Sequence, residues 1–223
     1  KFRFDEKSIS NTLLGVFIFF ASIAFFLHLV PGFYNPIVID NIQVSLNAPL
    51  YTQYLNFDKA LVGFCLLLYV VSRPKVVPYE QYLMVVGACS LAYAAAFLIA
   101  LTTGLVQLDI KFPDYLLTWC LINLFITTYA EEAFFRGFVQ KVIFDRISHK
   151  NWGALLTVLL SGSLFGLAHY PGGIVYMCIA TLLGCTFAFC YMRSKNILTP
   201  IIAHFIFNLI HFTVFTYPFI LEV

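Results

Sequence analysis

The chain has 223 residues, of which 61% are hydrophobic and only 11% are charged. A soluble globular domain has about 45–50% apolar and about 25% charged residues, so this composition excludes an ordinary soluble domain and indicates an integral membrane protein. The formal net charge of +2 is too small to suggest a nucleic-acid partner.

Seven apolar segments approach the length of a spanning helix, which needs about 20 mostly apolar residues. We therefore predict an all-α fold: a polytopic transmembrane helix bundle of one domain over residues 1–223, with seven spans around a polar intramembrane cavity. An eighth span is an alternative if residues 31–56 contain a re-entrant or interfacial piece. The first segment ends at Pro31-Gly32 without a small-residue cleavage site, which favours a retained span over a signal peptide. The predicted spans are 12–30, 57–72, 82–106, 114–137, 152–169, 173–192 and 198–217.

The distribution of basic residues predicts the orientation of these spans. With the N-terminus inside, most of the 13 Lys and Arg residues fall in the predicted cytoplasmic segments, among them Lys1, Arg73, Arg146 and Arg193. The positive-inside rule then predicts a cytoplasmic N-terminus and an external C-terminus.

The six cysteines lie within apolar stretches, and none forms a Cys-x-x-Cys pair. We expect them to be small buried hydrophobic side chains rather than disulfide partners or metal ligands.

The stretch Tyr129–Gly137 places two glutamates and an arginine inside an apolar segment. Ionisable groups at membrane depth are costly and usually mark a pathway, an ion pair or a reaction site. On a helix, Glu132 and Arg136 are four residues apart and share a face, in an order that favours an ion pair. Glu131 points about 100° away and has no such partner in its own helix. We therefore predict a structural pair Glu132–Arg136 and take Glu131 as a candidate general base.

A second polar site lies at the end of another predicted span. His169 closes the stretch Phe165-Gly-Leu-Ala-His169. Gly162 and Gly166 precede it with the small-xxx-small spacing that lets another helix approach closely.

The last predicted span carries the third polar site. His204 and Asn208 are four residues apart and share a helix face, and His211 falls on nearly the same face one turn later. His211 is expected at most to line a cavity. His28 and His149 are given no role.

Together these groups suggest hydrolysis. A carboxylate and an imidazole can hold and deprotonate a water molecule, while a second histidine and an asparagine can donate hydrogen bonds to a developing oxyanion. Each signal alone has a structural explanation, because an intramembrane histidine or asparagine is more often an interhelical hydrogen-bond partner. The presence of all three in apolar helices of one small domain favours a reaction site.

The polar residues form three ordered motifs. They are Glu131-Glu132-x-x-x-Arg136, Phe165-x-x-x-His169 and His204-x-x-x-Asn208. In order and spacing, these motifs resemble those of the CAAX protease and bacteriocin-processing family. Its members are intramembrane glutamic endopeptidases and include the type II CAAX prenyl endopeptidases. The resemblance covers about residues 113–215, which would be the catalytic core.

The resemblance implies a role for each motif residue. Glu131 and His169 would activate the water, and the Glu132–Arg136 pair would support the site. His204 and Asn208 would form the oxyanion hole. The implied reaction is hydrolysis of a peptide bond near the membrane surface. The implied partners are the lipid bilayer and a peptide or protein substrate, with or without a lipid, and the short loops suit a prokaryotic member in the cytoplasmic membrane.

A metal site is not expected, although glutamate and histidine can ligate zinc. The sequence has no His-Glu-x-x-His helix, and one of the two glutamates is neutralised by its predicted ion pair. We therefore expect no metal and no cofactor.

Depth counting conflicts with a simple assembly of the site. At about 1.5 Å per residue, Glu131, His204 and Asn208 fall at comparable depth, whereas His169, counted outwards along its own helix, falls close to the external surface. The site therefore requires the predicted helix 152–169 to begin below the interface or to tilt strongly.

Two other hypotheses stay open. A non-catalytic membrane protein, such as a transporter or a regulatory adaptor, would use the same polar residues as a relay or to join helices. Transporters usually have paired repeats and broken helices at the midplane, and the sequence shows neither. A peptidase fold without activity is the other hypothesis, and the intact motifs argue against it.

Overall fold

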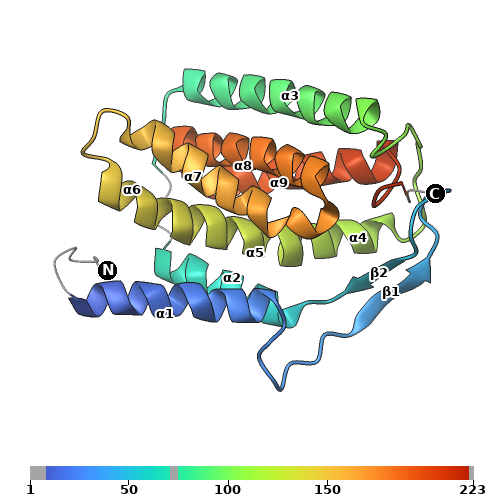
Figure 1. Cartoon of the computed structure of the whole chain (residues 1–223), viewed down its shortest axis with the longest axis horizontal. Helices are drawn as coiled ribbons and strands as arrows, with labels where there is room; N and C mark the ends of the chain where they lie inside the picture. Colours follow the sequence, from blue (N-terminus) through green and yellow to red (C-terminus); the bar gives the residue numbers. More distant parts are fainter. Residues whose placement is uncertain (1–8, 71–74, 221–223) are drawn as a thin grey trace.

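A computed structural model describes residues 9–70 and 75–220, and helices make up most of it (Figure 1). One two-stranded antiparallel sheet accompanies them. The prediction of a helical fold is confirmed. In chain order the elements are α1 (Ile9–Phe26), β1 (Ile37–Ile42), β2 (Tyr51–Tyr54), α2 (Phe57–Val70), α3 (Tyr79–Thr102), α4 (Leu116–Ile122), the π-helix η1 (Asn123–Thr128), α5 (Tyr129–Glu132), the π-helix η2 (Ala133–Gln140), α6 (Lys141–Ile147), α7 (Gly153–Ala168), the 3₁₀-helix η3 (Tyr170–Gly172), α8 (Ile174–Ser194) and α9 (Leu198–Val214).

The described helices differ in how well they fit a membrane. On length and composition, α3 and α8 are long and apolar enough to cross one, whereas α7, α9 and the Thr12–Phe26 part of α1 are apolar but shorter. α3 exposes Leu83, Leu91 and Leu98. Such a row of bare leucines suits contact with lipid rather than with water. The count of seven spans and their orientation stay predictions. Lys1 and Arg73, two of the basic residues used for the orientation, lie outside the described residues.

The helix that carries the glutamates is longer than predicted. Elements α4 to α6 form one helical run over 116–147, whereas the sequence suggested an end at 137. The sequence has no proline between these bounds, and Lys141 and Asp145 form an i,i+4 ion pair that supports the added turns. We call this run the motif helix.

Residues 31–56 contain a β-hairpin rather than a helix, and the alternative of an eighth span stays a prediction. Ile37 lies opposite Tyr54, and Ile42 lies opposite Tyr51. The β-branched residues of β1 favour an extended backbone. Asn47, with φ of 61°, provides the left-handed conformation that asparagine tolerates in the connection between the strands.

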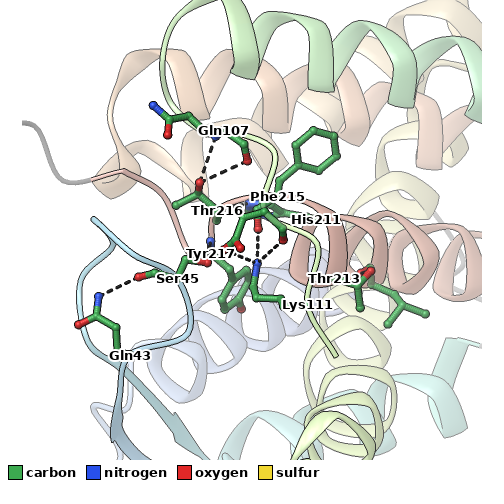
Figure 2. Close-up of polar contacts among 11 residues, drawn as sticks. Gln43, Ser45, Gln107, Lys111, His211, Thr213, Phe215, Thr216 and Tyr217 are labelled. Carbon is green, nitrogen blue, oxygen red and sulfur yellow. Dashed lines mark hydrogen bonds and ion pairs between the residues drawn. The ribbon is translucent and has the colours of Figure 1, made fainter. Parts of the chain in front are cut away.

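Polar contacts join the hairpin loop, the α3–α4 connection and the C-terminal segment (Figure 2). Leu108 and Phe215 form an antiparallel bridge. Lys111 Nζ donates a hydrogen bond to the Phe215 carbonyl. The Tyr217 N–H donates to Ser45 Oγ at 3.0 Å. Partial burial lowers the pKa of the Lys111 ammonium. These contacts fix the end of the bundle where α3 and α9 finish.

The cysteines depart in part from the prediction. All six are free thiols. Cys190 is buried, but Cys65 and Cys178 are exposed on the surfaces of α2 and α8, so the prediction of burial is wrong for these two. A small apolar side chain on a lipid-facing helix surface needs no protein cover, which is the physical reason for the difference.

Helices α7 and α8 approach closely at glycines, as the small-xxx-small spacing predicted. A Cβ added to Gly162 would lie 2.3 Å from Cys185 Sγ and 2.8 Å from Cys185 Cα. A Cβ added to Gly166 would lie 1.9 Å from Thr181 Oγ1. The absence of side chains at these two positions sets the separation of α7 and α8.

We predict that Gly162→Ala destabilises the protein by about 1–3 kcal/mol, because the two helices must separate. Gly87→Ala in α3 is the matched control, since a Cβ there meets nothing within 4 Å. The control is expected to be neutral or slightly stabilising, because glycine within a helix costs roughly 0.5–1 kcal/mol relative to alanine. Unfolding in detergent followed by circular dichroism measures both, and equal stabilities would contradict the close approach.

Candidate active site

The two adjacent glutamates lie in different environments. Glu132 is fully buried, and so is Arg136 one turn later. Glu131 is only partly buried. No hydrogen bond or ion pair joins Glu131 to another described residue. Their separation into two roles, predicted from helix faces, therefore has a counterpart in burial.

Glu132 contacts a different basic side chain with each of its oxygens. Arg136 Nε lies 3.1 Å from Glu132 Oε2, so the predicted ion pair is present. This contact is an ion pair without the alignment of a hydrogen bond. His204 Nδ1 lies 2.9 Å from Glu132 Oε1. Glu132 thus joins α5 to α9, a link between residues 72 apart in the chain that the sequence analysis missed because it assigned Glu132 only to Arg136.

Arg136 lies among aromatic rings and backbone of α7 and α8. Its Nη2 donates a hydrogen bond to the Gly184 carbonyl at 2.8 Å. The guanidinium carbon lies 4.6 Å from the Phe165 ring centroid and 5.6 Å from that of Phe187. Cation–π contacts of this kind compensate in part for the loss of hydration. Phe165, which opens the second motif, therefore contacts the residue that closes the first.

His169 lies directly after the end of α7. Its Nδ1 lies 2.8 Å from the Phe165 carbonyl oxygen. Because a carbonyl only accepts, this contact assigns the proton to Nδ1 and leaves Nε2 unprotonated in the neutral ring. The His169 ring lies 4.5 Å from the Phe165 ring and 5.7 Å from the Tyr176 ring, between centroids. An oriented imidazole with a free basic nitrogen is suited to accept a proton.

Asn208 is oriented by a residue that the sequence analysis did not identify. Its Nδ2 donates a hydrogen bond to Asn123 Oδ1 at 3.3 Å. Asn123 is buried at the start of η1, on the motif helix. A polar residue inside the apolar segment 114–137 was the available signal, and it was passed over because Asn123 belongs to none of the three motifs.

One cavity brings three of the four predicted catalytic residues together. His169, His204 and Asn208 all line it, and so does His211, as expected. Its volume is about 60 Å³, more than the 10–15 Å³ that a single water molecule requires. The remaining wall is mainly apolar and aromatic and comes from α3, the α3–α4 connection, α7, α8, α9 and the C-terminal segment. Glu131 is not among the residues that line this cavity.

The cavity brings His169 together with His204 and Asn208, although depth counting had separated His169 from them. Figure 1 shows α7 inclined across α8 and α9. His169 lies at the end of α7 and yet faces the same cavity as His204, near the beginning of α9.

The backbone of the motif helix is unusual around the glutamates. Two π-helical segments, η1 and η2, flank the single α-helical turn that holds Glu131 and Glu132. π-helical segments in α-helices occur frequently at functional sites.

Within the described residues, no group of three or more His, Cys, Asp or Glu side chains is placed to hold a metal ion.

Comparison with known proteins matches the part of the chain that carries the motifs. Residues 113–210 match the model of the family described as "Type II CAAX prenyl endopeptidase Rce1-like". A protein of Bacillus subtilis (strain 168), named "Putative membrane peptidase YdiL", is 36% identical over 78 residues, which are 35% of this chain and 29% of that relative. The match thus covers less than a third of the relative's length. No solved structure matches the chain.

We predict that Glu132→Gln destabilises the protein by about 3–5 kcal/mol, because it leaves the buried Arg136 charge without a partner. The double variant Glu132→Leu/Arg136→Met, which removes both charges, is expected to recover most of this loss. Unfolding of the three proteins in detergent measures the effect. A double variant as unstable as the single one would show that the pair contributes more than charge compensation.

Proposed function

We propose that the chain is an intramembrane peptidase of the CAAX protease and bacteriocin-processing family, because residues 113–210 match the type II CAAX prenyl endopeptidase-like family and carry all three motifs. Its substrate is a peptide or protein, with or without a lipid, cleaved near the surface of a prokaryotic cytoplasmic membrane. The N-terminus lies on the cytoplasmic side, in accord with the distribution of Lys and Arg.

The observation that carries the proposal is the shared cavity. Two histidines and an asparagine from α7 and α9 meet in one space that has room for water and mainly apolar walls. Polar hydrogen-bonding groups in a space of low polarity act more strongly than they would in bulk water. Interhelical hydrogen bonding alone explains such a cluster less well. The Nε2 atoms of His169 and His204 have no hydrogen-bond partner among the described residues.

Water activation is assigned to Glu131 and His169. Glu131 is the available carboxylate, since both oxygens of Glu132 are occupied by Arg136 and His204. His169 presents Nε2 as a base, because its Nδ1–H donates a hydrogen bond to the Phe165 carbonyl. The two groups share the tasks of orienting a water molecule and removing its proton as it attacks the scissile carbonyl carbon.

The oxyanion is assigned to His204 and Asn208. One hydrogen of the Asn208 amide is bound to Asn123, which leaves the second hydrogen for the developing negative charge. His204 donates through Nε2, which requires a proton on both ring nitrogens, and Glu132 accepts the proton on Nδ1. The combined charge of Glu132, Arg136 and a protonated His204 is then +1, which is the sign that stabilises an oxyanion.

The mechanism proposed here is independent of a metal. Glu132, the most buried carboxylate of the motif helix, is committed to an arginine and a histidine and has no free oxygen for a cation. A chelator is therefore expected to leave the activity unchanged. Abolition of activity by a chelator, with restoration by zinc, would overturn this part of the proposal.

We predict that Glu131→Ala and His169→Ala each reduce peptide cleavage by at least 10²-fold, the lower range of general acid–base contributions. The assay uses purified protein in lipid vesicles and a peptide library, with products identified by mass spectrometry. His149→Ala, an exposed histidine of the α6–α7 connection, is the matched control and is expected to cleave like the wild type.

Two results would contradict the proposal in different ways. Cleavage unchanged in both Glu131→Ala and His169→Ala would place the chemistry elsewhere in the molecule. Absence of cleavage by folded wild-type protein across the library, with and without lipidated peptides, would favour a non-catalytic protein that uses these residues as a relay.

A further inference from the structure

A larger hollow lies on another side of the motif helix. Its volume is about 470 Å³, within the range of roughly 300–1,000 Å³ that is typical of ligand pockets. One wall is the first half of α1, and the other is formed by η2 and α6 with one side chain of α7. We call it the α1 groove. Among its lining residues are Thr12, Gly15, Phe19, Phe138, Val142 and Arg146.

The α1 groove is polar at one end and apolar along its length. Thr12 and Arg146 meet at the polar end, where Arg146 Nη2 donates to Thr12 Oγ1 at 3.5 Å. Phe19 and Phe138 lie further along their helices, at roughly 10–12 Å from this end by the rise per residue. α1 and the motif helix run in opposite directions, since Phe19 also packs on Phe134. Both walls therefore change from polar to apolar in the same direction.

The polar end carries positive charge. Asp145 also lines this end of the groove, but its carboxylate is paired with Lys141 and forms no ion pair with Arg146. Lys150 Nζ lies 4.6 Å from the ring centroid of Trp152, which is half exposed. A tryptophan beside basic residues is typical of the membrane–water interface. A polar end at Arg146 followed by apolar walls matches the order of headgroup and acyl chain in a lipid.

We propose that the α1 groove binds one anionic phospholipid of the surrounding bilayer, with its phosphate at Arg146 and an acyl chain along the apolar walls. A guanidinium group matches phosphate in charge and in its paired donors. The guanidinium of Arg146, which forms no ion pair with a carboxylate of the described residues, favours an anionic headgroup over a zwitterionic one. The lipid joins α1 to the motif helix over the length where a groove, rather than packed side chains, separates them.

Lipid binding to the full chain tests the proposal without any assay of catalysis. The delipidated protein in neutral detergent is mixed with phosphatidylglycerol or phosphatidylcholine. Native mass spectrometry counts the bound lipids, and thermal unfolding measures the Tm. One phosphatidylglycerol molecule is expected to bind preferentially and to raise the Tm more than phosphatidylcholine does.

Two variants address the two ends of the groove. Arg146→Ala is expected to weaken phosphatidylglycerol binding about tenfold, as for the loss of one hydrogen bond between charged groups. Gly15→Phe is expected to fill the apolar part without a clash, because a Cβ at Gly15 meets nothing within 4 Å. It should abolish both the bound lipid and the lipid-dependent rise in Tm. Val16→Trp, on the same wall, replaces it if Gly15→Phe does not fold.

Matched controls separate this site from general effects of lipid and charge. Gly87→Phe places the same ring on α3, at a glycine where a Cβ also meets nothing within 4 Å. Arg193→Ala removes an arginine from the end of α8. Both are expected to bind lipid like the wild type. If the groove-filling variants retain the lipid and the rise in Tm, the lipid is not in the α1 groove. If phosphatidylcholine stabilises the wild type equally, the assignment of the headgroup to Arg146 is wrong.

Discussion

The burial of the Glu132–Arg136 pair is the constraint on which the rest of the site depends. Removing two charges from water costs several kcal/mol for each ion, and their mutual attraction repays this only when further polar contacts are available. Here α7 supplies the Phe165 ring, α8 supplies the Gly184 carbonyl, and α9 supplies the imidazole of His204. Three helices must therefore reach the pair at once. Phe165 and His204, which contact the pair, belong to the two histidine motifs, so the same contacts also position those motifs.

The glycines of α7 and α8 make that arrangement possible. The Gly184 carbonyl oxygen accepts a hydrogen bond from Arg136. A Cβ on Gly184 would lie 2.8 Å from the Gly162 carbonyl oxygen. The close approach of the two backbones thus serves the arginine and also brings Phe165 over the guanidinium. His169 follows one turn later, directly after the end of α7, and its Nδ1 donates a hydrogen bond to the Phe165 carbonyl. The orientation of His169 in the cavity is therefore linked, through Phe165, to the packing around the buried Arg136 guanidinium.

Local patterns predicted the parts of this structure that depend on neighbours in the sequence. Hydropathy placed the helices, and the i,i+4 spacing predicted the Glu132–Arg136 pair, because both depend on residues within one or two turns. The contacts of Glu132 with His204 and of Asn208 with Asn123 join distant segments and leave no local pattern. The π-helical segments were missed because their hydrogen-bond register responds to tertiary packing rather than to side-chain periodicity. The meeting of His169 with His204 and Asn208 at one cavity likewise depends on how α7 and α9 pack.

The motif helix has a different environment on each of its sides, and this relates the site to the bilayer. All eight residues of η2 are buried. A helix that faces lipid would instead expose the residues on one of its sides. α2 and α7 cover part of it, and Phe138 and Val139 are also walls of the α1 groove. Phe138 and Val139 are buried by protein alone, whereas Val16 and Phe20 on the opposite wall are exposed and are covered only when the groove is filled. If the filling group is a lipid, the packing around the helix that holds Glu131, Glu132 and Arg136 is completed by the membrane itself, and detergent extraction removes part of that packing.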